Sequence, residues 1–200
     1  MQAIRCCLLI GNSRWHWAIE KSDSWYFLDT SPNPQSYEFL NVPIVAWAAV
    51  GSLPKNILLQ PSKKIHLQDI PLQNLPPWLG IDRALAGWGA FQKAKALCSN
   101  SLGILVADAG TVLSLTQITS KGEFAGGQLI AGLSLQLSAM ADGTKNLTNP
   151  GPQCSNTNLF PIKTAEAMQR GSLQALIGAL IEAKKDSNMP LWLCGGDSPL

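Results

Sequence analysis

Charged side chains are scarce in this sequence: Asp, Glu, Lys and Arg together make up 14% of its 200 residues, and the formal net charge is +2. No long run of Lys or Arg occurs, so the charge pattern does not indicate nucleic-acid binding. The hydrophobic share of 46% is typical of a globular chain and not of a disordered one. A site for one small anion is still compatible with this composition, because such a pocket needs only a few donors.

The residues of common metal sites and the signals of secreted proteins are also missing. The two histidines, His16 and His66, lie in unrelated contexts, and the five cysteines form no CxxC pair, so we predict no zinc site. Free thiols are typical of a reducing cytosol. The apolar stretch at the N-terminus ends at Gly11, which makes it too short for a signal peptide or a membrane span. We therefore expect a cytoplasmic protein with no membrane partner.

Two frequent catalytic motifs are absent as well. The sequence has no GxxxxGK[ST] loop, so a Walker-type phosphate cradle is excluded. The segment Gly87-Trp88-Gly89 lacks the third glycine of a dinucleotide motif and lies within a helical pattern. Ser13, His16 and Asp82 are the residue types of a catalytic triad, but nothing in the sequence indicates that they form one. The position of His16 is that of an ordinary strand side chain.

What the sequence does contain is a short buried strand that ends in a polar, glycine-containing turn. The apolar run 102–107 predicts the strand, Asp108-Ala109-Gly110-Thr111 follows it, and a strand pattern resumes over 112–119. Glycine lets a ligand approach the backbone, the turn can offer N–H groups to an anion, and Asp108 can hold a cation. Taken alone, the segment is equally compatible with an ordinary hairpin turn.

A similar corner occurs near the N-terminus. Residues 4–10 predict a first strand, Gly11-Asn12-Ser13 interrupts it, and residues 14–20 predict a second strand with Trp15, Trp17 and Ile19 on one face. A third strand is expected at 25–28. The repetition of strand, polar corner and strand indicates a duplicated α/β unit.

The remaining elements complete a mixed α/β pattern. We expect strands at 42–50, 65–67, 123–130 and 191–194, and helices at 80–98, 132–142 and from 164 onward. The apolar face of the first helix is predicted to consist of Ile81, Leu85, Trp88 and Phe91. That of the second consists of Leu133, Leu137 and Met140. That of the third consists of Leu173, Leu176, Ile177, Leu180 and Ile181.

The sequence also contains two notable acids, Asp82 and Asp108, and together with the glycine-containing corners they suggest phosphoryl transfer. That chemistry needs backbone donors around phosphates, a metal ion and a group that positions or deprotonates the accepting hydroxyl. The corners can supply donors, Asp108 a cation contact, and Asp82 the base. Asp82 also falls in the first turn of a predicted helix, where a carboxylate complements the helix dipole without any catalytic role. A glycosidase would use two carboxylates too, but it gives no reason for the glycine pairs.

In their order, these segments resemble the motifs of the type III pantothenate kinases. Each piece alone is weak, whereas the ordered set is specific and runs from the first strand to the end of the chain. The matching segments are Gly11-Asn12-Ser13, Gly80-Ile81-Asp82-Arg83, Asp108-Ala109-Gly110-Thr111, Gly126-Gly127, Gly132-Leu133, Thr144-Lys145-Asn146-Leu147, Thr164-Ala165-Glu166-Ala167 with Gly171, and Gly195-Gly196.

The resemblance implies an actin-like ATPase fold made of two ribonuclease-H-like halves, with mixed sheets flanked by helices. We expect these halves at 1–100 and 101–200. It also implies an ATP-dependent kinase that phosphorylates pantothenate to 4′-phosphopantothenate, the first step of coenzyme A biosynthesis. The expected partners are ATP, pantothenate and a second copy of the chain in a homodimer. The expected cofactors are Mg²⁺ bound with ATP and a monovalent cation, K⁺ or NH₄⁺.

The resemblance further implies a role for each matching residue. Asp82 corresponds to the base for the pantothenate hydroxyl, Arg83 to the group that holds the pantothenate carboxylate, and Asp108 to the ligand of the monovalent cation. The other residues of the pantothenate site would be Gly80, Ile81 and Thr164. The residues of the ATP site would be Gly11, Asn12, Ser13, Gly110, Thr111, Gly195 and Gly196.

The sequence departs from the family pattern in three respects. Leu9 stands where the family has an acid two residues before the glycine, and a leucine cannot hold Mg²⁺ or its water shell. Ala131 replaces a usual proline. The pattern also continues with a strand or helix after Gly196, so we expect the second half to lack its last element. Leu9 leaves an alternative open, a non-catalytic regulatory protein of the same fold, like the Bvg accessory factor.

Overall fold

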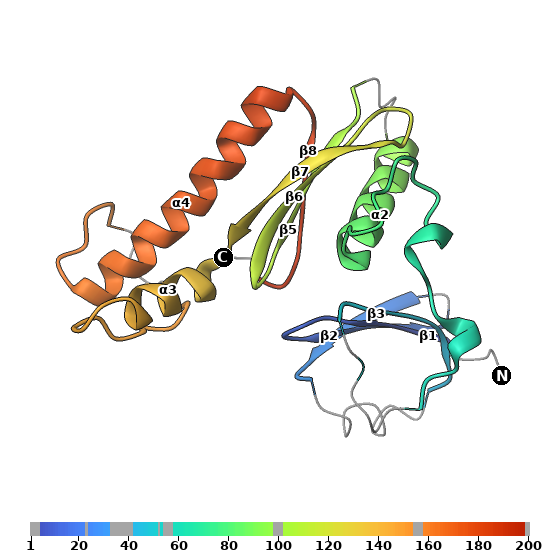
Figure 1. Ribbon diagram of the computed structural model, residues 1–200, viewed down its shortest axis with the longest axis horizontal. Helices are drawn as coiled ribbons and strands as arrows, with labels where there is room; N and C mark the ends of the chain where they lie inside the picture. Colours follow the sequence, from blue (N-terminus) through green and yellow to red (C-terminus); the bar gives the residue numbers. More distant parts are fainter. Residues whose placement is uncertain are drawn as a thin grey trace. The chain divides into compact units, whose positions relative to one another are not determined.

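The computed structural model describes residues 5–22, 24–32, 42–51, 53, 58–97, 102–153 and 158–198. The chain forms two compact units, Met1–Leu85 and Ala86–Leu200 (Figure 1). Helix α2 (Ile81–Leu97) begins in the first unit and continues into the second. The division into halves at residue 100 stays a prediction. Cys98 and Cys154 lie outside the described residues.

The first unit contains a four-stranded mixed sheet. Its strands are β1 (Arg5–Ile10), β2 (Trp15–Lys21), β3 (Ser24–Thr30) and β4 (Ile44–Ala49), in the spatial order β3-β2-β1-β4. The first three strands pair antiparallel as a meander, and β4 pairs parallel with β1. These four strands confirm the prediction made from hydrophobic alternation.

The connection after β4 differs from its prediction. The expected strand at 65–67 is wrong: the segment contains two 3₁₀ turns, η1 (Pro61–Lys63) and η2 (Leu67–Asp69). A single bridge pairs Lys64 with Trp47. Pro61, at the start of η1, has no N–H to donate to a neighbouring strand.

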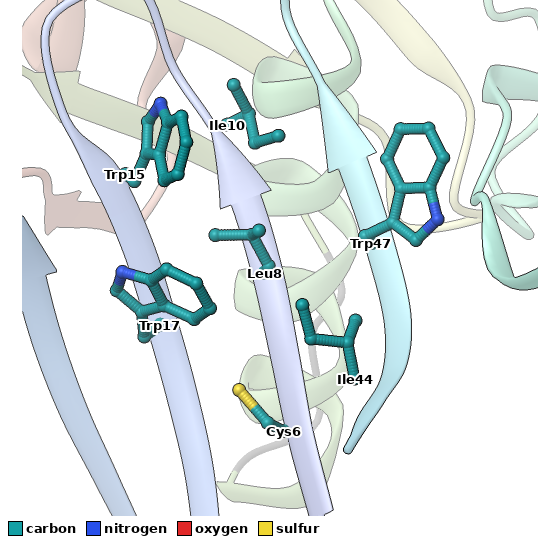
Figure 2. Close-up of a cluster of buried hydrophobic side chains, with 7 residues drawn as sticks. All are labelled: Cys6, Leu8, Ile10, Trp15, Trp17, Ile44 and Trp47. Atoms are coloured by element: carbon teal, nitrogen blue, oxygen red, sulfur yellow. The ribbon is translucent and has the colours of Figure 1, made fainter. Parts of the chain in front are cut away.

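Alternation of side chains along the strands builds the core of the first unit. One face of β1 and β2 carries large apolar residues that pack together with two residues of β4 (Figure 2). The cluster consists of Cys6, Leu8, Ile10, Trp15, Trp17, Ile44 and Trp47. The buried indoles satisfy their N–H groups: Trp17 donates to Thr30 Oγ1 at 3.0 Å, and Trp47 donates to the Gln60 carbonyl at 2.9 Å. The predicted inward face of β2 is therefore confirmed for both tryptophans.

Strand β3 is different because both of its faces are open. It lies at the edge of the sheet, and among the described residues it pairs only with β2. Phe27 is 80% exposed, and the other large residues Trp25, Tyr26 and Leu28 are exposed as well.

The second unit repeats the arrangement of the first. Its strands are β5 (Ile104–Ala109), β6 (Val112–Ile118), β7 (Phe124–Ala131) and β8 (Leu191–Cys194), in the order β7-β6-β5-β8. Again three strands form an antiparallel meander, and the fourth pairs parallel with the first. The same topology therefore occurs twice, which confirms the predicted actin-like fold of two ribonuclease-H-like units.

The helices of the second unit pack on this sheet and on one another. Helix α4 (Thr164–Ser187) packs against β5 and β6 through Leu176 and Leu180, and α3 (Leu133–Asp142) packs on α4 through Leu133, Leu137 and Met168. The predicted inward face of α3 is confirmed. The predicted stripe of α4 is partly wrong, because Ile177 and Ile181 are 43% and 61% exposed. Among the described residues, no helix is long and apolar enough to cross a membrane.

The buried face of α2 differs from the predicted one. Phe91 is buried as expected, but Ile81, Leu85 and Trp88 are only half-buried. The other fully buried positions are the small residues Ala84, Gly87 and Ala94, at spacings of three, four and three with Phe91. The hydrophobic pattern did not predict this face, because glycine and alanine contribute little to such a pattern. Their small size allows a neighbouring element to approach closely.

One stability prediction follows from the exposed glycine in α4. Gly178 is helical, and a Cβ placed on it meets no atom within 4 Å. We expect Gly178→Ala to stabilise the protein by about 0.5–1 kcal/mol, because alanine loses less backbone entropy in a helix. Thermal unfolding followed by circular dichroism measures the change. A lower midpoint would show that this part of α4 is covered in solution.

Candidate active site

The first polar corner is a tight turn between β1 and β2. The Gly11 N–H donates to the Arg14 carbonyl at 3.0 Å, and a Cβ on Gly11 would lie 2.8 Å from that oxygen. The turn therefore requires glycine at this position. Asn12 and Ser13, which follow it, are exposed to solvent. The structure thus brings together the three residues that the sequence predicts for this corner.

The end of β4 lies beside the same corner. The Val50 N–H donates to the Ile10 carbonyl at 2.8 Å, which extends the pairing of β4 with β1. Gly51 then adopts a φ of +83°, and a Cβ there would lie 3.7 Å from Asn12 Oδ1. The Asn12 side chain therefore reaches the backbone at the end of β4. Sequence reasoning did not assign Gly51 to the site, although a glycine directly after a buried strand was the available signal.

The second corner has the same construction with closer contacts. Gly195 follows β8 with a φ of +96°, and a Cβ on it would lie 2.2 Å from the Ala109 carbonyl and 2.5 Å from Asp108 Oδ1. The Asp197 N–H donates to the Ala109 carbonyl at 2.9 Å. The turn of Gly195, Gly196 and Asp197 therefore encloses the end of β5, and only glycine fits against the Asp108 carboxylate.

Gly132 supports this corner from the other side. Its N–H donates to the Thr111 carbonyl at 2.9 Å, and a Cβ there would lie 2.0 Å from the Gly110 carbonyl. Helix α3 begins at the next residue, so its N-terminus, with the positive end of the helix dipole, lies next to Gly110 and Thr111. Such a position favours a bound anion. Gly110 itself is open, since a Cβ would meet nothing within 4 Å.

The charge of Asp108 acts on its neighbour in β8. The pKa of the Cys194 thiol is raised to about 12, first by burial and second by the negative charge of Asp108. The thiol therefore stays protonated near neutral pH and is not a nucleophile.

Asp82 and Arg83 lie in the first turn of α2. Asp82 Oδ1 accepts a hydrogen bond from the Arg83 backbone N–H at 2.8 Å, and a Cβ on Gly80 would lie 2.5 Å from the same oxygen. Gly80 thus leaves room for the carboxylate. Burial lowers the pKa of the Arg83 guanidinium, and the charge of Asp82 opposes this shift. A guanidinium is suited to bind a carboxylate through its planar fork of donors.

The other predicted site residues lie within these segments or at the start of α4. Ile81 is the first residue of α2, and Gly196 lies within the turn after β8. Thr164 is the first residue of α4 and is exposed. Sequence reasoning missed the supporting roles of Gly132 and Asp197, because both depend on contacts with a strand far away in the sequence.

The metal-binding capacity of the described residues is limited. They contain no group of three or more His, Cys, Asp and Glu side chains that could hold an ion. Asp108 stands two residues before Gly110, and the corresponding position before Gly11 is Leu9, which has no donor atom. Asp108 fits a cation as one oxygen ligand, whereas the first corner does not supply a carboxylate for Mg²⁺ from Leu9.

A cavity of about 500 Å³ lies elsewhere in the second unit, between α4 and strands β5, β6 and β7. Its polar lining includes the carboxylates of Glu182 and Asp186. Two negative charges oppose the binding of a phosphate. The cavity is therefore unfavourable for a phosphate.

Comparisons with known proteins agree with this construction. The family model for type III pantothenate kinase matches residues 55–185. A type III pantothenate kinase of Thermosynechococcus vestitus is 34% identical over 96% of this chain and 77% of the relative. The enzyme of that name from Synechococcus elongatus is 32% identical over 98% of this chain and 85% of the relative.

A solved structure shares the fold. A Campylobacter jejuni protein described as a conserved member of the Baf family of transcriptional activators superposes with a TM-score of 0.57 at 22% identity, covering 97% of this chain and 84% of that one. From the family model and the curated relatives together, the chain belongs to the type III pantothenate kinase family.

Proposed function

We propose that this protein transfers the γ-phosphate of ATP to pantothenate and forms 4′-phosphopantothenate, the first step of coenzyme A biosynthesis. The observation that carries the proposal is the second corner. There Gly132 and Gly195 hold the Asp108-Ala109-Gly110-Thr111 backbone from two sides and leave Gly110 open. In a member of this family, such a corner is a segment that can bind the phosphate groups of ATP.

Each polar corner, taken by itself, carries groups that can bind phosphate oxygens. Gly11, Asn12 and Ser13 in the first unit and Gly110 and Thr111 in the second offer short polar side chains and backbone N–H groups to phosphate oxygens. The N-terminus of α3 adds a favourable potential behind Gly110. Gly195 and Gly196, which have no side chains, flank the adenosine.

The start of α2 acts on pantothenate. Asp82 accepts the proton of the attacking hydroxyl while the oxygen forms its bond to the γ-phosphorus, and the bond from that phosphorus to the bridging oxygen of ADP breaks. Arg83 holds the pantothenate carboxylate, a pairing suited to its planar fork of donors. The remaining contacts to pantothenate come from Gly80, Ile81 and Thr164.

Two cations belong to the proposal. Asp108 would hold K⁺ or NH₄⁺ beside the phosphates, because its carboxylate can supply one oxygen ligand to such a cation. Mg²⁺ enters with ATP and supplies charge neutralisation of the phosphates. Because Leu9 has no donor atom, the chain would offer Mg²⁺ no ligand at that position. We further propose a cytoplasmic homodimer.

The proposal is tested by measuring ADP release from ATP with and without pantothenate, in the presence of Mg²⁺ and K⁺. We expect release that depends on pantothenate, together with a product whose mass is that of phosphopantothenate. The same assay without K⁺ tests the role of the monovalent cation. ADP release that is indifferent to pantothenate would contradict the proposal.

Leu9 favours a second candidate function, a non-catalytic regulatory protein like the Bvg accessory factor. A protein that no longer transfers phosphate would tolerate the loss of a metal-facing acid. ATP binding without any phosphopantothenate formation is the result expected of that candidate.

A further inference from the structure

The cavity of about 500 Å³ in the second unit lies between the C-terminal half of α4 and the sheet. In the register of the sheet, Gln117 of β6 lies opposite Leu105 of β5 and Gly126 of β7. Directly opposed residues point to the same face of a sheet, and Leu105 packs in the cluster beneath α4, so Gln117 faces α4 as well. Gly126 and its neighbour Gly127, which lines the cavity, bring no side chains to the β7 end of this row, and this leaves room.

The helix side of the cavity consists of one face of α4. The lining residues of this helix are Ala179, Glu182, Ala183, Asp186 and Ser187. They are spaced by three or four residues and therefore lie on one side of the helix. The two alanines add to the apolar wall formed by Leu105 and Leu115, whereas the two carboxylates stand one helical turn apart. A volume of this size, with mostly apolar walls and a few polar groups, is typical of small-molecule sites.

The two carboxylates are unfavourably placed for α4 itself. Glu182 and Asp186 are four residues apart, and like charges at this spacing repel each other on a helix. Asp186 also lies in the last helical turn, where the negative end of the helix dipole favours cations such as Lys184 and Lys185. Lys185 pairs with Glu182 at 3.8 Å, but both side chains are mostly exposed, so this pair is weak. The helix therefore gives no reason for an acid at position 186, whereas a cation bound in the cavity does.

The groups around the carboxylates favour an ammonium group over a metal ion. The described part of the chain has no group of three His, Cys, Asp and Glu side chains that could hold a metal. A further polar group of the lining is the amide of Gln117, whose Nε2 donates to Met189 Sδ at 3.6 Å and whose oxygen can accept a hydrogen bond. An ammonium group has three N–H donors, which match two carboxylates and one amide oxygen. The apolar wall suits a hydrocarbon chain attached to that group.

We propose that this cavity binds a primary alkylammonium group, held by Glu182, Asp186 and the Gln117 amide, with its hydrocarbon chain along Leu105 and Leu115. Such a group can belong to a free aliphatic amine or to the lysine side chain of another protein, since both present the same chemistry. The inference does not rest on the proposed function, because none of these residues belongs to the proposed ATP or pantothenate sites.

Titration calorimetry and thermal unfolding of the full chain test the inference, with 1-aminopentane as the probe. We expect the unfolding midpoint to rise with the concentration of 1-aminopentane, because a ligand of the folded chain stabilises it. Neither 1-pentanol, which has the chain without the charge, nor Ca²⁺, which has charge without the chain, is expected to give such a rise. Nα-acetyl-lysine methylamide distinguishes the two sources: tighter binding than that of 1-aminopentane supports a lysine side chain, and weaker binding supports a free amine.

Two isosteric variants remove the charges one at a time. We expect Glu182→Gln and Asp186→Asn each to weaken the binding of 1-aminopentane about tenfold to a hundredfold, the loss of one charge-assisted hydrogen bond. Without the amine, Asp186→Asn should unfold about 1–4 °C above the unaltered chain, because it removes a negative charge from the negative end of the helix dipole. Higher stability of the free variant together with weaker amine binding is the signature expected of a binding residue.

Asp142→Asn is the matched control. Asp142 is the last residue of α3 and is exposed, so this variant makes the same change at the end of a helix outside the cavity. It should raise the midpoint by a similar amount and leave amine binding as it is.

The inference is overturned if the double variant of Glu182→Gln and Asp186→Asn binds 1-aminopentane as tightly as the unaltered chain. It is also overturned if 1-pentanol or Ca²⁺ raises the midpoint as much as the amine does. A lower midpoint of free Asp186→Asn contradicts it as well, because that result assigns the carboxylate a structural partner. The kinase assignment is tested separately by phosphopantothenate formation, which none of these outcomes decides.

Discussion

Replacing Asp82 by asparagine is expected to lower kcat for pantothenate phosphorylation about 10²–10⁴-fold, the contribution typical of a positioned general base. The amide keeps an oxygen in the place of Oδ1, so the hydrogen bond from the Arg83 N–H at 2.8 Å can persist. It cannot accept the proton of the hydroxyl. Asp82→Asn therefore removes the proposed base while it keeps the hydrogen bond at the start of α2.

The alanine variant at the same position removes both properties. Asp82→Ala is expected to lose turnover as Asp82→Asn does and to lose, in addition, about 0.5–1.5 kcal/mol of stability, because alanine cannot accept the hydrogen bond from the Arg83 N–H. Turnover is measured as ADP release at saturating ATP and pantothenate, and stability as the midpoint of thermal unfolding. Two variants with equal kcat and unequal midpoints are the expected pattern.

Asp69 supplies the matched control for this prediction. Its Oδ2 accepts a hydrogen bond from the His66 N–H at 2.7 Å at the start of η2, so its carboxylate has the same structural role as that of Asp82. Asp69→Asn is expected to leave kcat unchanged. If Asp82→Asn turned over as fast as Asp69→Asn, the proton of the hydroxyl would leave by another route and the assigned base would be wrong.

The strands of both sheets were predictable because their signal is local. Trp15 and Trp17 alternate with polar neighbours, and alternation over a few residues is enough to identify a half-buried strand. The buried face of α2 was not predictable in the same way. Gly87 contributes no hydrophobicity, yet it is buried where Trp88 is only half-buried, so its burial depends on a neighbouring element that the pattern does not contain.

The same distinction holds for the site. Gly11-Asn12-Ser13 and Asp108 to Thr111 are contiguous segments, so their residue types alone predict polar corners. The contacts of Gly132 with Gly110 and of Gly195 with Ala109 join segments far apart in the sequence. The row of Leu105, Gln117 and Gly126 beside the cavity depends on the register of two hairpins. Register follows from turn length and packing together, and neither is visible in single residues.

A single added methyl group at Gly195 is expected to destabilise the protein by about 2–5 kcal/mol. The φ of +96° is unfavourable for any residue with a Cβ, and that atom would lie 2.2 Å from the Ala109 carbonyl and 2.5 Å from Asp108 Oδ1. That Cβ would also lie 2.5 Å from the Ala109 nitrogen, so two of its three contacts are to backbone atoms of β5, which cannot move without breaking the pairing of β5 with β8. Gly195→Ala should therefore lower the unfolding midpoint and abolish ATP binding together.

Gly110→Ala separates the two effects, because its methyl group would meet nothing within 4 Å and its φ is not positive. We expect its stability to change by less than about 0.5 kcal/mol. Its ATP affinity, by contrast, should fall about tenfold or more, since the methyl group stands where a phosphate must approach the backbone. Gly178→Ala in α4 makes the same chemical change outside the corner and should leave ATP affinity as it is. If Gly110→Ala bound ATP normally, the second corner would be a structural hairpin and the phosphates of ATP would have to bind elsewhere.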